Sequence, residues 1–125
     1  MSKAKLRVLD CTLRDGGYYN NWDFTHDLVE KYLAAMNQAG IDAIEIGFRF
    51  LEADTFLGPY GYSTDEFLET ILPEDRPVIG VMVNCKDVVT YEDGAVAAID
   101  RLFKPAVESP VDLVRVACHF RHLED

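Results

Sequence analysis

The stretch LDCTLRDGGYYNNWDF, residues 9–24, leaves an apolar segment through an adjacent arginine and aspartate, two glycines and a cluster of aromatic rings. A plain turn after a buried strand needs glycine or a small polar residue, but it needs no arginine. The stretch follows the first of several apolar runs that recur along the chain. Its position in that repeat decides how the fold and the polar residues are interpreted.

Four short runs rich in β-branched residues recur with a spacing of about 35 residues, as one βα unit and its loops would. The runs are LRVLD (6–10), DAIEIGF (42–48), PVIGVMVN (77–84) and VDLVRVACHF (111–120). They are continuously apolar rather than alternating, which is typical of parallel strands covered on both faces. Parallel neighbours require crossover connections, which are right-handed in nearly all proteins.

Three helices are expected between these runs. They run from Thr25 to Gly40, from Ser63 to Pro73, and from about residue 95 to Lys104-Pro105. Ser63 and Glu66 have the spacing of a capping box at the start of the second helix. One face of the first helix is apolar and carries Leu28, Val29, Tyr32, Leu33 and Met36.

The resulting order of strand, helix, strand, helix, strand, helix, strand predicts an α/β fold with a parallel sheet. Two architectures fit, an open doubly wound sheet and the opening part of an eight-stranded barrel. A whole barrel needs roughly 250 residues. A chain of 125 residues would supply about half. No internal domain boundary is visible, so we expect residues 1–125 to form one partial domain.

The formal net charge of −10 argues against nucleic acid, which is bound by clustered Lys and Arg, and against anionic membranes. No apolar run approaches the roughly 18 residues of a membrane span, and the start is too short in its apolar part for a signal peptide. We therefore expect a cytoplasmic protein. Its three cysteines, Cys11, Cys85 and Cys118, form no CxxC pair and are expected to be reduced thiols.

Polar side chains gather where the expected strands end. They are Asp10, Thr12, Arg14, Asp15, Glu45, Arg49, Asn84, Arg115 and His119. In both parallel architectures ligands bind at the carboxyl ends of the strands. A sheet that served stability alone would not need this set. The sequence therefore predicts a functional site at this end of the sheet.

Glu45 and Arg115 each lie between aliphatic neighbours within an apolar run. A buried carboxylate must be paired, bound to a ligand or protonated, and a buried arginine needs an anionic partner because it cannot lose its charge. Two interpretations stay open. The residues form a structural ion pair, or they orient groups and contact substrate in a polar pocket.

Arg14 and Asp15 are adjacent, so in an extended segment their side chains would point in different directions. Asp15 offers a hard oxygen ligand of the kind that magnesium or manganese accepts. Arg14 offers a fork of donors for a carboxylate or a developing enolate oxygen. Gly16 and Gly17 are expected to let the backbone turn sharply close to a ligand.

Three motifs carry a resemblance to a known family. DCTLRDGG (10–17), IEIGF (44–48) and VRVACH (114–119) closely resemble, in order and spacing, the motifs of a family of metal-dependent barrels. That family contains 4-hydroxy-2-oxovalerate aldolase, hydroxymethylglutaryl-CoA lyase, isopropylmalate synthase and homocitrate synthase. The resemblance covers essentially the whole chain but only about the first half of the family's barrel. It implies the N-terminal half, about four βα units, of a TIM (β/α)8 barrel.

The resemblance also implies roles for individual residues. Asp15 corresponds to the ligand of a divalent cation, manganese or magnesium, and Arg14 to the arginine that stabilises an enolate. Asp10 and Glu45 correspond to acidic residues that shape the site. The implied chemistry makes or breaks a carbon–carbon bond beside a carbonyl through a metal-bound enolate, which in the aldolases is that of pyruvate.

Two departures from the family concern proton transfer and metal binding. The oxovalerate aldolases resemble R-D-G-x-H, with the histidine as base, where this chain has Tyr18 or Tyr19. Tyrosine is a poorer base at neutral pH, so a perturbed Tyr19 or His119 is the candidate instead. The family's His-x-His metal pair lies on a later strand, and His119 and His122 do not match its place. The fragment alone is expected to turn over little or nothing.

The favoured function is a metal-dependent aldolase or lyase that cleaves or forms a 4-hydroxy-2-oxo acid, with Arg14, Glu45 and Tyr19 as catalytic residues. The expected substrate contacts are Asp10, Thr12, Asn84, Arg115 and His119. One alternative is a Claisen-type acyltransferase, although that branch generally continues the motif with Glu-Gln. The other is a non-catalytic half-barrel module, whose open edges would favour self-association. We expect a 2-oxo acid substrate and a homo-oligomer.

Two aromatic segments remain ambiguous. The long loop RFLEADTFLGPYGYS (49–63) is interpreted as a lid or binding loop, or as a packed surface excursion. The rings of Tyr18, Tyr19, Trp22 and Phe24 could line a pocket or hold the first helix on the barrel. Packing is favoured for Trp22 and Phe24.

Overall fold

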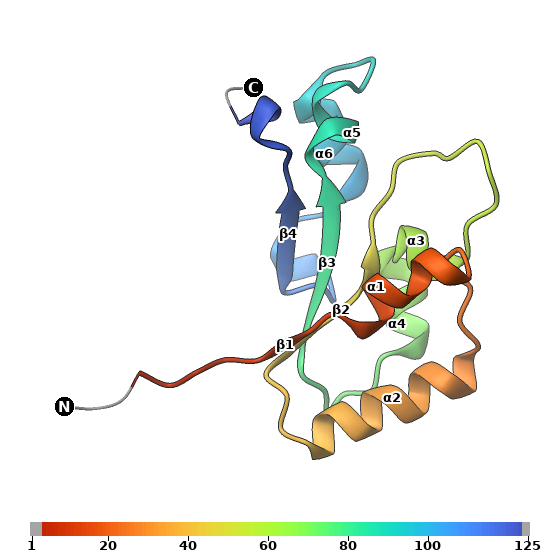
Figure 1. Cartoon of the computed structure of the whole chain (residues 1–125), viewed down its shortest axis with the longest axis vertical. Helices are drawn as coiled ribbons and strands as arrows, with labels where there is room; N and C mark the ends of the chain where they lie inside the picture. The colour runs from red at the N-terminus through yellow and green to blue at the C-terminus, as the bar shows by residue number, and fades with distance from the viewer. Residues whose placement is uncertain (1–3, 124–125) are drawn as a thin grey trace.

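The computed structural model describes residues 4–123 and contains one sheet of four parallel strands in the order β1-β2-β3-β4 (Figure 1). The strands are β1 (Leu9–Asp10), β2 (Ala43–Phe48), β3 (Val78–Asn84) and β4 (Leu113–Ala117). A doubly wound sheet reverses its strand order at a switch point, whereas barrel strands follow one another in sequence. The strict sequential order excludes the doubly wound alternative, and the sheet has the arrangement of a half barrel.

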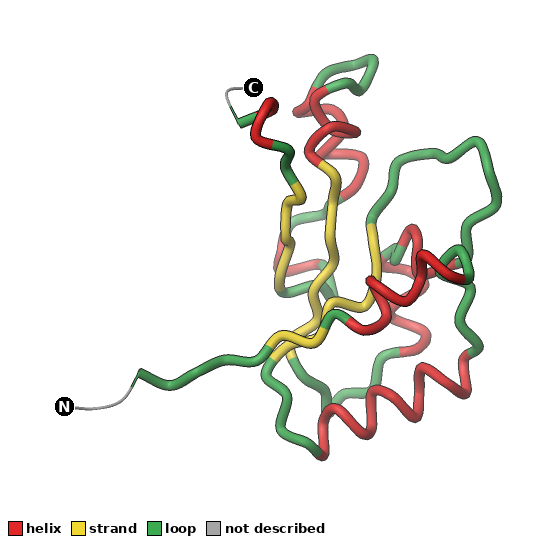
Figure 2. The backbone as a smooth tube through the Cα atoms, viewed as in Figure 1, coloured by secondary structure: helices red, strands yellow, loops and turns green. Residues whose placement is uncertain are grey.

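Helical segments alternate with the strands, as expected (Figure 2). The α-helices are α1 (Thr12–Gly16), α2 (His26–Gln38), α3 (Pro59–Tyr62), α4 (Asp65–Ile71), α5 (Cys85–Val89) and α6 (Ala95–Leu102). Short 3-10 turns are η1 (Gly17–Tyr19), η2 (Ala106–Glu108) and η3 (Phe120–His122). The three long helical patterns of the sequence correspond to α2, α4 and α6. The short α1, α3 and α5 directly follow strands or lie in loops and were not predicted.

Helix α2 confirms the prediction made from its ends. The Thr25 hydroxyl accepts a hydrogen bond from the amide of Leu28 at 3.4 Å, and Gly40 has a φ of +70° just beyond the helix. Both features are standard start and stop signals. Val29 and Leu33 are buried, whereas Leu28, also expected on the apolar face, is exposed.

The start of α4 corrects the expected capping box. Thr64, not Ser63, is the N-cap, and its hydroxyl accepts a hydrogen bond from the amide of Phe67 at 3.2 Å. Ser63 instead ends the preceding helix α3 in a left-handed conformation with a φ of 40°. Glu66, the expected partner of Ser63, forms an ion pair with Lys104. The prediction failed because the aromatic loop contains the short helix α3, for which Ser63 is the C-cap.

The core lies where β2 and β3 meet the helices. Both faces of β3 are buried from Ile79 to Val83, as the continuous apolar run predicted. Leu68 of α4 and Ala98 of α6 are fully buried. None of the helices within residues 4–123 has both the length and the apolar content that crossing a membrane requires.

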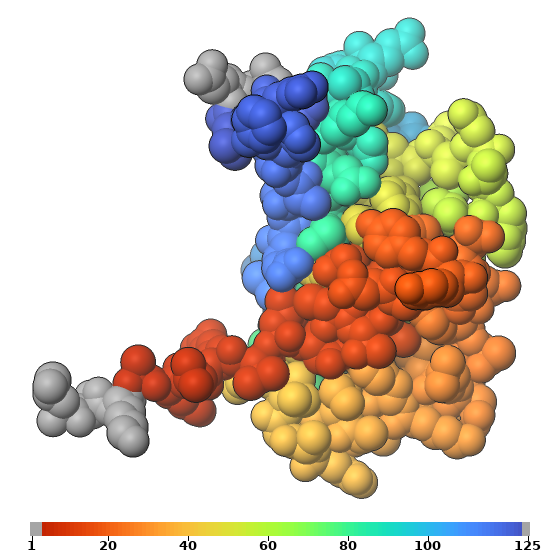
Figure 3. Space-filling view, viewed as in Figure 1, coloured from red at the N-terminus to blue at the C-terminus, as the bar shows by residue number. Residues whose placement is uncertain are grey.

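The outer strands are shorter than expected. The run 6–10 contributes only Leu9 and Asp10 to the sheet, and the segment before them extends away from the body of the molecule (Figure 3). Leu6 is 86% exposed, because β1 pairs only with β2 among the described residues. The run 111–120 forms a strand only from Leu113 to Ala117. Edge strands lack a second partner, which explains why apolar patterning overestimated both lengths.

Candidate functional site

Arg14 and Asp15 lie on α1, which begins directly after β1. The expectation of an extended segment was wrong, because Thr12–Gly16 is helical. Arg14 and Asp15 form an ion pair with each other through Nη1 and Oδ1, a contact that the extended interpretation had excluded. Asp15 is 65% exposed, so its carboxylate is accessible from solvent.

Arg14 is also bound to Glu45. The Nε of Arg14 donates a hydrogen bond to Oε1 of Glu45 at 2.6 Å, and its guanidinium carbon lies 5.8 Å from the centre of the Phe48 ring. Only 14% of the Arg14 side chain is exposed. A guanidinium fixed by a buried carboxylate and an aromatic face has little freedom to rotate.

A β-bulge makes this arrangement possible. Glu45 and Phe48 are three positions apart, so in a regular strand they would face opposite sides of the sheet. The register between β2 and β3 shifts between Glu45 and Gly47, which leaves Ile46 as the extra residue. As a result both side chains contact Arg14 from the same side. Sequence alternation alone could not have identified Phe48 as a member of the site.

The second oxygen of Glu45 faces Arg115 of β4. Nε of Arg115 lies 2.8 Å from Oε2, but no donor points at this oxygen with the direction that a hydrogen bond requires. The contact is therefore an ion pair of short distance and poor alignment. Because Glu45 is fully buried and arginine keeps its charge, the attraction remains substantial. The Glu45–Arg115 ion pair, one of the two interpretations that the sequence left open, is present, and Arg14 joins it.

The cluster thus contains two arginines and two carboxylates, Arg14, Arg115, Glu45 and Asp15, which balance in formal charge. It is contributed by α1, β2 and β4, and it is mostly removed from solvent on the Glu45 side. The structural and functional interpretations of Glu45 and Arg115 are therefore compatible, since Glu45 pairs with Arg115 through one oxygen and holds Arg14 through the other.

Gly16 and Gly17 do not form the sharp backbone turn that was expected of them. Both have ordinary helical φ values, −64° and −61°, so neither supplies a special turn. A Cβ at Gly17 would lie 1.9 Å from Cδ1 of Trp22. Trp22 is buried there and donates a hydrogen bond from Nε1 to the carbonyl of Arg14 at 2.9 Å. The packing interpretation of Trp22 is confirmed.

Asp10 is the last residue of β1, and Thr12 is the first residue of α1. Asp10 accepts hydrogen bonds from the Thr12 amide at 3.0 Å and the Thr12 hydroxyl at 3.1 Å, and a third from the hydroxyl of Tyr32. Burial raises the pKa of Asp10, but these hydrogen bonds outweigh it, so the pKa lies below its ordinary value. In this structure both predicted substrate contacts hold the helix that carries Arg14.

Cys11 lies beside this cluster and was not expected there. Burial raises the pKa of its thiol, and the charge of Glu45 raises it further against the smaller opposing effects of Arg115 and Arg14. A protonated thiol is a poor nucleophile and a poor metal ligand. Cys11 and Cys85 are free thiols, as predicted.

The remaining predicted site residues are not joined to the cluster. Tyr19 is 95% exposed. Asn84 donates to Asp87 at 3.3 Å, and Nδ1 of His119 accepts from the Arg121 amide at 3.3 Å. Among residues 4–123 no hydrogen bond or ion pair links these three to Arg14 or Glu45. Their roles stay predictions.

The donor set fits a divalent cation only in part. Asp15 is a hard, accessible oxygen ligand of the kind that magnesium and manganese prefer. Glu45 does not fit, because both of its oxygens face arginines. Within the described part of the chain no three His, Cys, Asp or Glu side chains come together in a way that could hold a metal. Asp15 would therefore need ligands from elsewhere.

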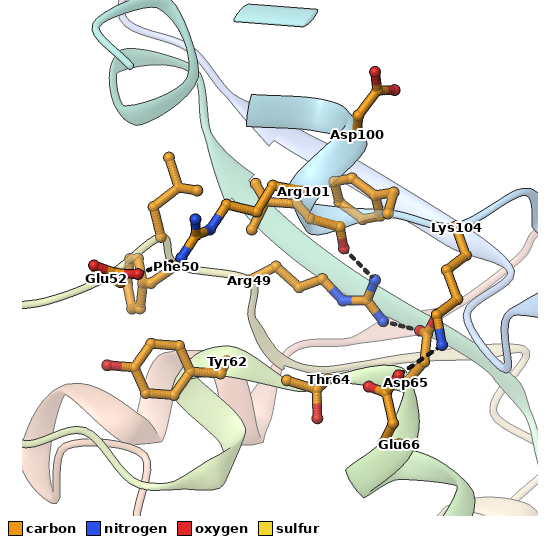
Figure 4. A pocket seen from close by; sticks show the side chains of 13 residues that line it. Arg49, Phe50, Glu52, Tyr62, Thr64, Asp65, Glu66, Asp100, Arg101 and Lys104 are labelled. Atoms are coloured by element: carbon orange, nitrogen blue, oxygen red, sulfur yellow. Dashed lines mark hydrogen bonds and ion pairs between the residues drawn. The ribbon is translucent and has the colours of Figure 1, made fainter. Parts of the chain in front are cut away.

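A separate cavity of about 350 Å³ lies between the end of β2, α4 and α6 (Figure 4). Arg49, another polar residue expected at the strand ends, is buried there. It pairs with Asp65 and donates to the carbonyls of Ser63 at 3.1 Å and Leu102 at 2.7 Å. These contacts join β2 to both helices, so Arg49 has a structural role away from the Arg14 cluster.

Comparisons with known proteins agree with this geometry. No protein-family model matches the chain. A 4-hydroxy-2-oxovalerate aldolase from Salinispora arenicola is 32% identical over 93% of this chain and 32% of its own length, and one from Pelotomaculum thermopropionicum is 29% identical over 92% and 32%. The crystal structure of the N-terminal domain of a "putative aldolase" from Bacteroides vulgatus superposes with a TM-score of 0.75 at 38% identity, over 89% of this chain and 35% of that one.

This chain resembles the N-terminal part of an aldolase. It spans about a third of the length of the curated relatives it matches. An oxaloacetate decarboxylase from Mycobacterium tuberculosis is also similar, 38% identical over 48% of this chain and 18% of its own length. The aldolase-like character predicted from the three sequence motifs is therefore confirmed, as is the half-barrel architecture.

Proposed function

We propose that this chain is the N-terminal half-barrel, residues 1–125, of an aldolase that cleaves or forms a 4-hydroxy-2-oxo acid by way of a pyruvate enolate. The observation that carries the proposal is the fixed position of Arg14 at the carboxyl end of the parallel strands, held by Glu45 and paired with the accessible Asp15. This is the end of a barrel at which active sites are found.

The names of the relatives support the same reaction class. Aldol cleavage of 4-hydroxy-2-oxovalerate and decarboxylation of oxaloacetate both remove a group from the carbon next to a 2-oxo function. In each reaction the electron pair of the broken carbon–carbon bond stays on the three-carbon skeleton of pyruvate. A protein that stabilises the enolate of pyruvate can therefore serve both reactions.

Arg14 is the group of this chain best suited to that task. Its guanidinium is permanently charged, and it is already oriented by Glu45, so it could receive a developing oxyanion without reorganisation. Arg115 faces the other oxygen of Glu45 at 2.8 Å and balances its formal charge. We propose that Arg115 also faces the carboxylate of the 2-oxo acid.

Asp15 would hold a divalent cation together with ligands from another part of the whole protein. Such a cation, when bound, supplies a Lewis acid that polarises the substrate carbonyl. Asp15 is paired with Nη1 of Arg14. If the carboxylate of Asp15 bound a cation instead, this nitrogen could donate to the substrate. Tyr19 and His119 remain the proposed proton-transfer groups, and Thr12 and Asn84 proposed substrate contacts.

The test is pyruvate release by the complete natural protein that carries this chain, assayed on 4-hydroxy-2-oxo acids with and without manganese. We expect metal-dependent release, which falls about 100-fold in Arg14→Lys and at least as far in Asp15→Asn. Asp27→Asn, on the exposed side of α2, is the matched control and should keep full activity.

Two results would contradict the proposal. Condensation of an acyl-CoA with a 2-oxo acid, measured as free thiol, would place the protein among the acyltransferases. Wild-type-like pyruvate release by Asp15→Asn at every manganese concentration would remove the proposed role of Asp15.

A further inference from the structure

Helix α1 is too short to be stable by itself. It has five residues, whereas isolated helices shorter than about 12 residues are marginal in water. Its N-cap residue, Cys11, makes no side-chain capping hydrogen bond. The orientation of Arg14 and Asp15, which this helix carries, must therefore come from contacts with other parts of the chain.

Asp10 replaces the missing cap from one residue earlier. Its Oδ1 accepts the amide of Thr12 at 3.0 Å, and its Oδ2 accepts the hydroxyl of Thr12 at 3.1 Å. One of the free amides at the start of α1 is thereby satisfied. Asp10 can do this only while its carboxylate stays in one rotamer. Both hydrogen bonds come from Thr12, so they tie Asp10 to the start of α1 but not to the rest of the molecule.

Tyr32 fixes that carboxylate from α2. Its hydroxyl donates to Oδ1 of Asp10, the same oxygen that accepts the Thr12 amide. Burial and the charge of Asp10 raise the pKa of Tyr32 well above its ordinary value, so the hydroxyl remains a donor throughout the physiological range. Because α2 is a 13-residue helix packed on the core by Val29 and Leu33, Tyr32 is anchored to a rigid element.

We propose that Tyr32 is a positioning residue, which acts through Asp10 to fix the start of α1 and so directs Arg14 toward Glu45. The structural part of this inference is independent of the reaction, and its effect on turnover rests on the proposed function. Trp22 supports the middle of the helix by donating to the carbonyl of Arg14 at 2.9 Å. The two contacts together hold the start and the middle of α1.

Tyr32→Phe distinguishes the contribution of the hydroxyl from that of the ring, because the substitution keeps the aromatic packing and removes only the donor. The matched control is Tyr91→Phe, which removes another tyrosine hydroxyl, one that accepts from Arg101 at 3.4 Å and lies between α5 and α6. Both variants are made in the complete natural protein and compared by hydrogen–deuterium exchange, with peptides that cover residues 10–17 and 26–38.

Loss of a hydrogen bond to a charged acceptor should accelerate exchange in residues 10–17 about tenfold in Tyr32→Phe. Exchange in residues 26–38 should stay unchanged, and Tyr91→Phe should alter neither segment. Unchanged exchange in residues 10–17 would overturn the proposal. Equal acceleration of both segments would also overturn it, because that result indicates a general loss of stability.

Turnover gives the second readout. Where the wild type releases pyruvate, we expect Tyr32→Phe to lower kcat at least about fivefold with KM changed less than about twofold, since misplacing a catalytic group costs rate more than affinity. Unchanged kcat would overturn the proposed role of Tyr32 in placing Arg14. If the wild type shows no turnover while the exchange result holds, the proposed function fails and the positioning of α1 by Tyr32 stands.

Discussion

Arg14 donates to Glu45 at 2.6 Å and thereby connects α1, the first helical turn after β1, to the middle of β2. Glu45 is fully buried, so the hydrogen bond forms in a region of low effective dielectric, where charge pairs attract strongly. The same carboxylate faces Arg115 of β4. One side chain therefore links three elements that are far apart in the sequence, and its removal should affect both stability and the site.

Glu45→Gln should lower the free energy of unfolding by about 2–3 kcal/mol, because two arginines then face a buried neutral group. The amide keeps the size of the side chain, so the loss reports charge rather than a cavity. Urea denaturation of wild type and variant measures it. Lys31→Ala, which removes an exposed pair with Asp27, is the control and should cost less than about 0.5 kcal/mol.

Gly17→Ala should destabilise the protein by about 1–3 kcal/mol, since its Cβ would lie 1.9 Å from the buried Trp22 ring. The adjacent Gly16→Ala is a matched comparison, because both glycines have helical φ values and its nearest contact would be Phe24 at an ordinary 3.6 Å. Thermal denaturation should show Gly16→Ala as stable as wild type, or more stable by up to about 1 kcal/mol. Equal losses in both variants would contradict the packing account of Trp22.

Asp10 should make stability depend on acidity. Hydrogen bonds hold its pKa below the unfolded value of 3.8, so its contribution is present above that value and is lost as pH falls through the lower, folded pKa. Urea midpoints measured across this acidic range should therefore fall less steeply in Asp10→Asn than in wild type. An identical slope in the two proteins would show that the hydrogen bonds to Asp10 do not favour its ionised form.

The sequence predicted those elements whose signals are local. Thr25 and Gly40 define α2 by cap chemistry, and the continuous apolar run around Val81 defines a strand buried on both faces. Arg14, Asp15 and Glu45 could be named as candidates because each belongs to a short motif of adjacent residues, and the structure joins them in one cluster. In each case the deciding property belongs to the residue or its close neighbours.

Other features depend on tertiary contacts and could not be predicted in this way. The bulge at Ile46 reverses the side to which Phe48 points, and nothing in the alternation of β2 shows it. Helix α1 exists because Asp10 and Trp22 stabilise it, so local propensity did not indicate a helix there. Tyr32 was recognised as one residue of an apolar face, yet its hydroxyl reaches Asp10, a contact that only the packing of α2 creates.

We propose that Asp15 and Arg14 together form the metal-binding side of an enolate site. The decisive experiment is a crystal structure of the complete natural protein, soaked with manganese and the enolate mimic oxalate, in which the anomalous signal locates the metal. We predict a manganese ion coordinated by Asp15, with the guanidinium of Arg14 directed at an oxalate oxygen and Glu45 still bound to its Nε. A manganese-saturated crystal in which Asp15 faces solvent without a cation would contradict the account.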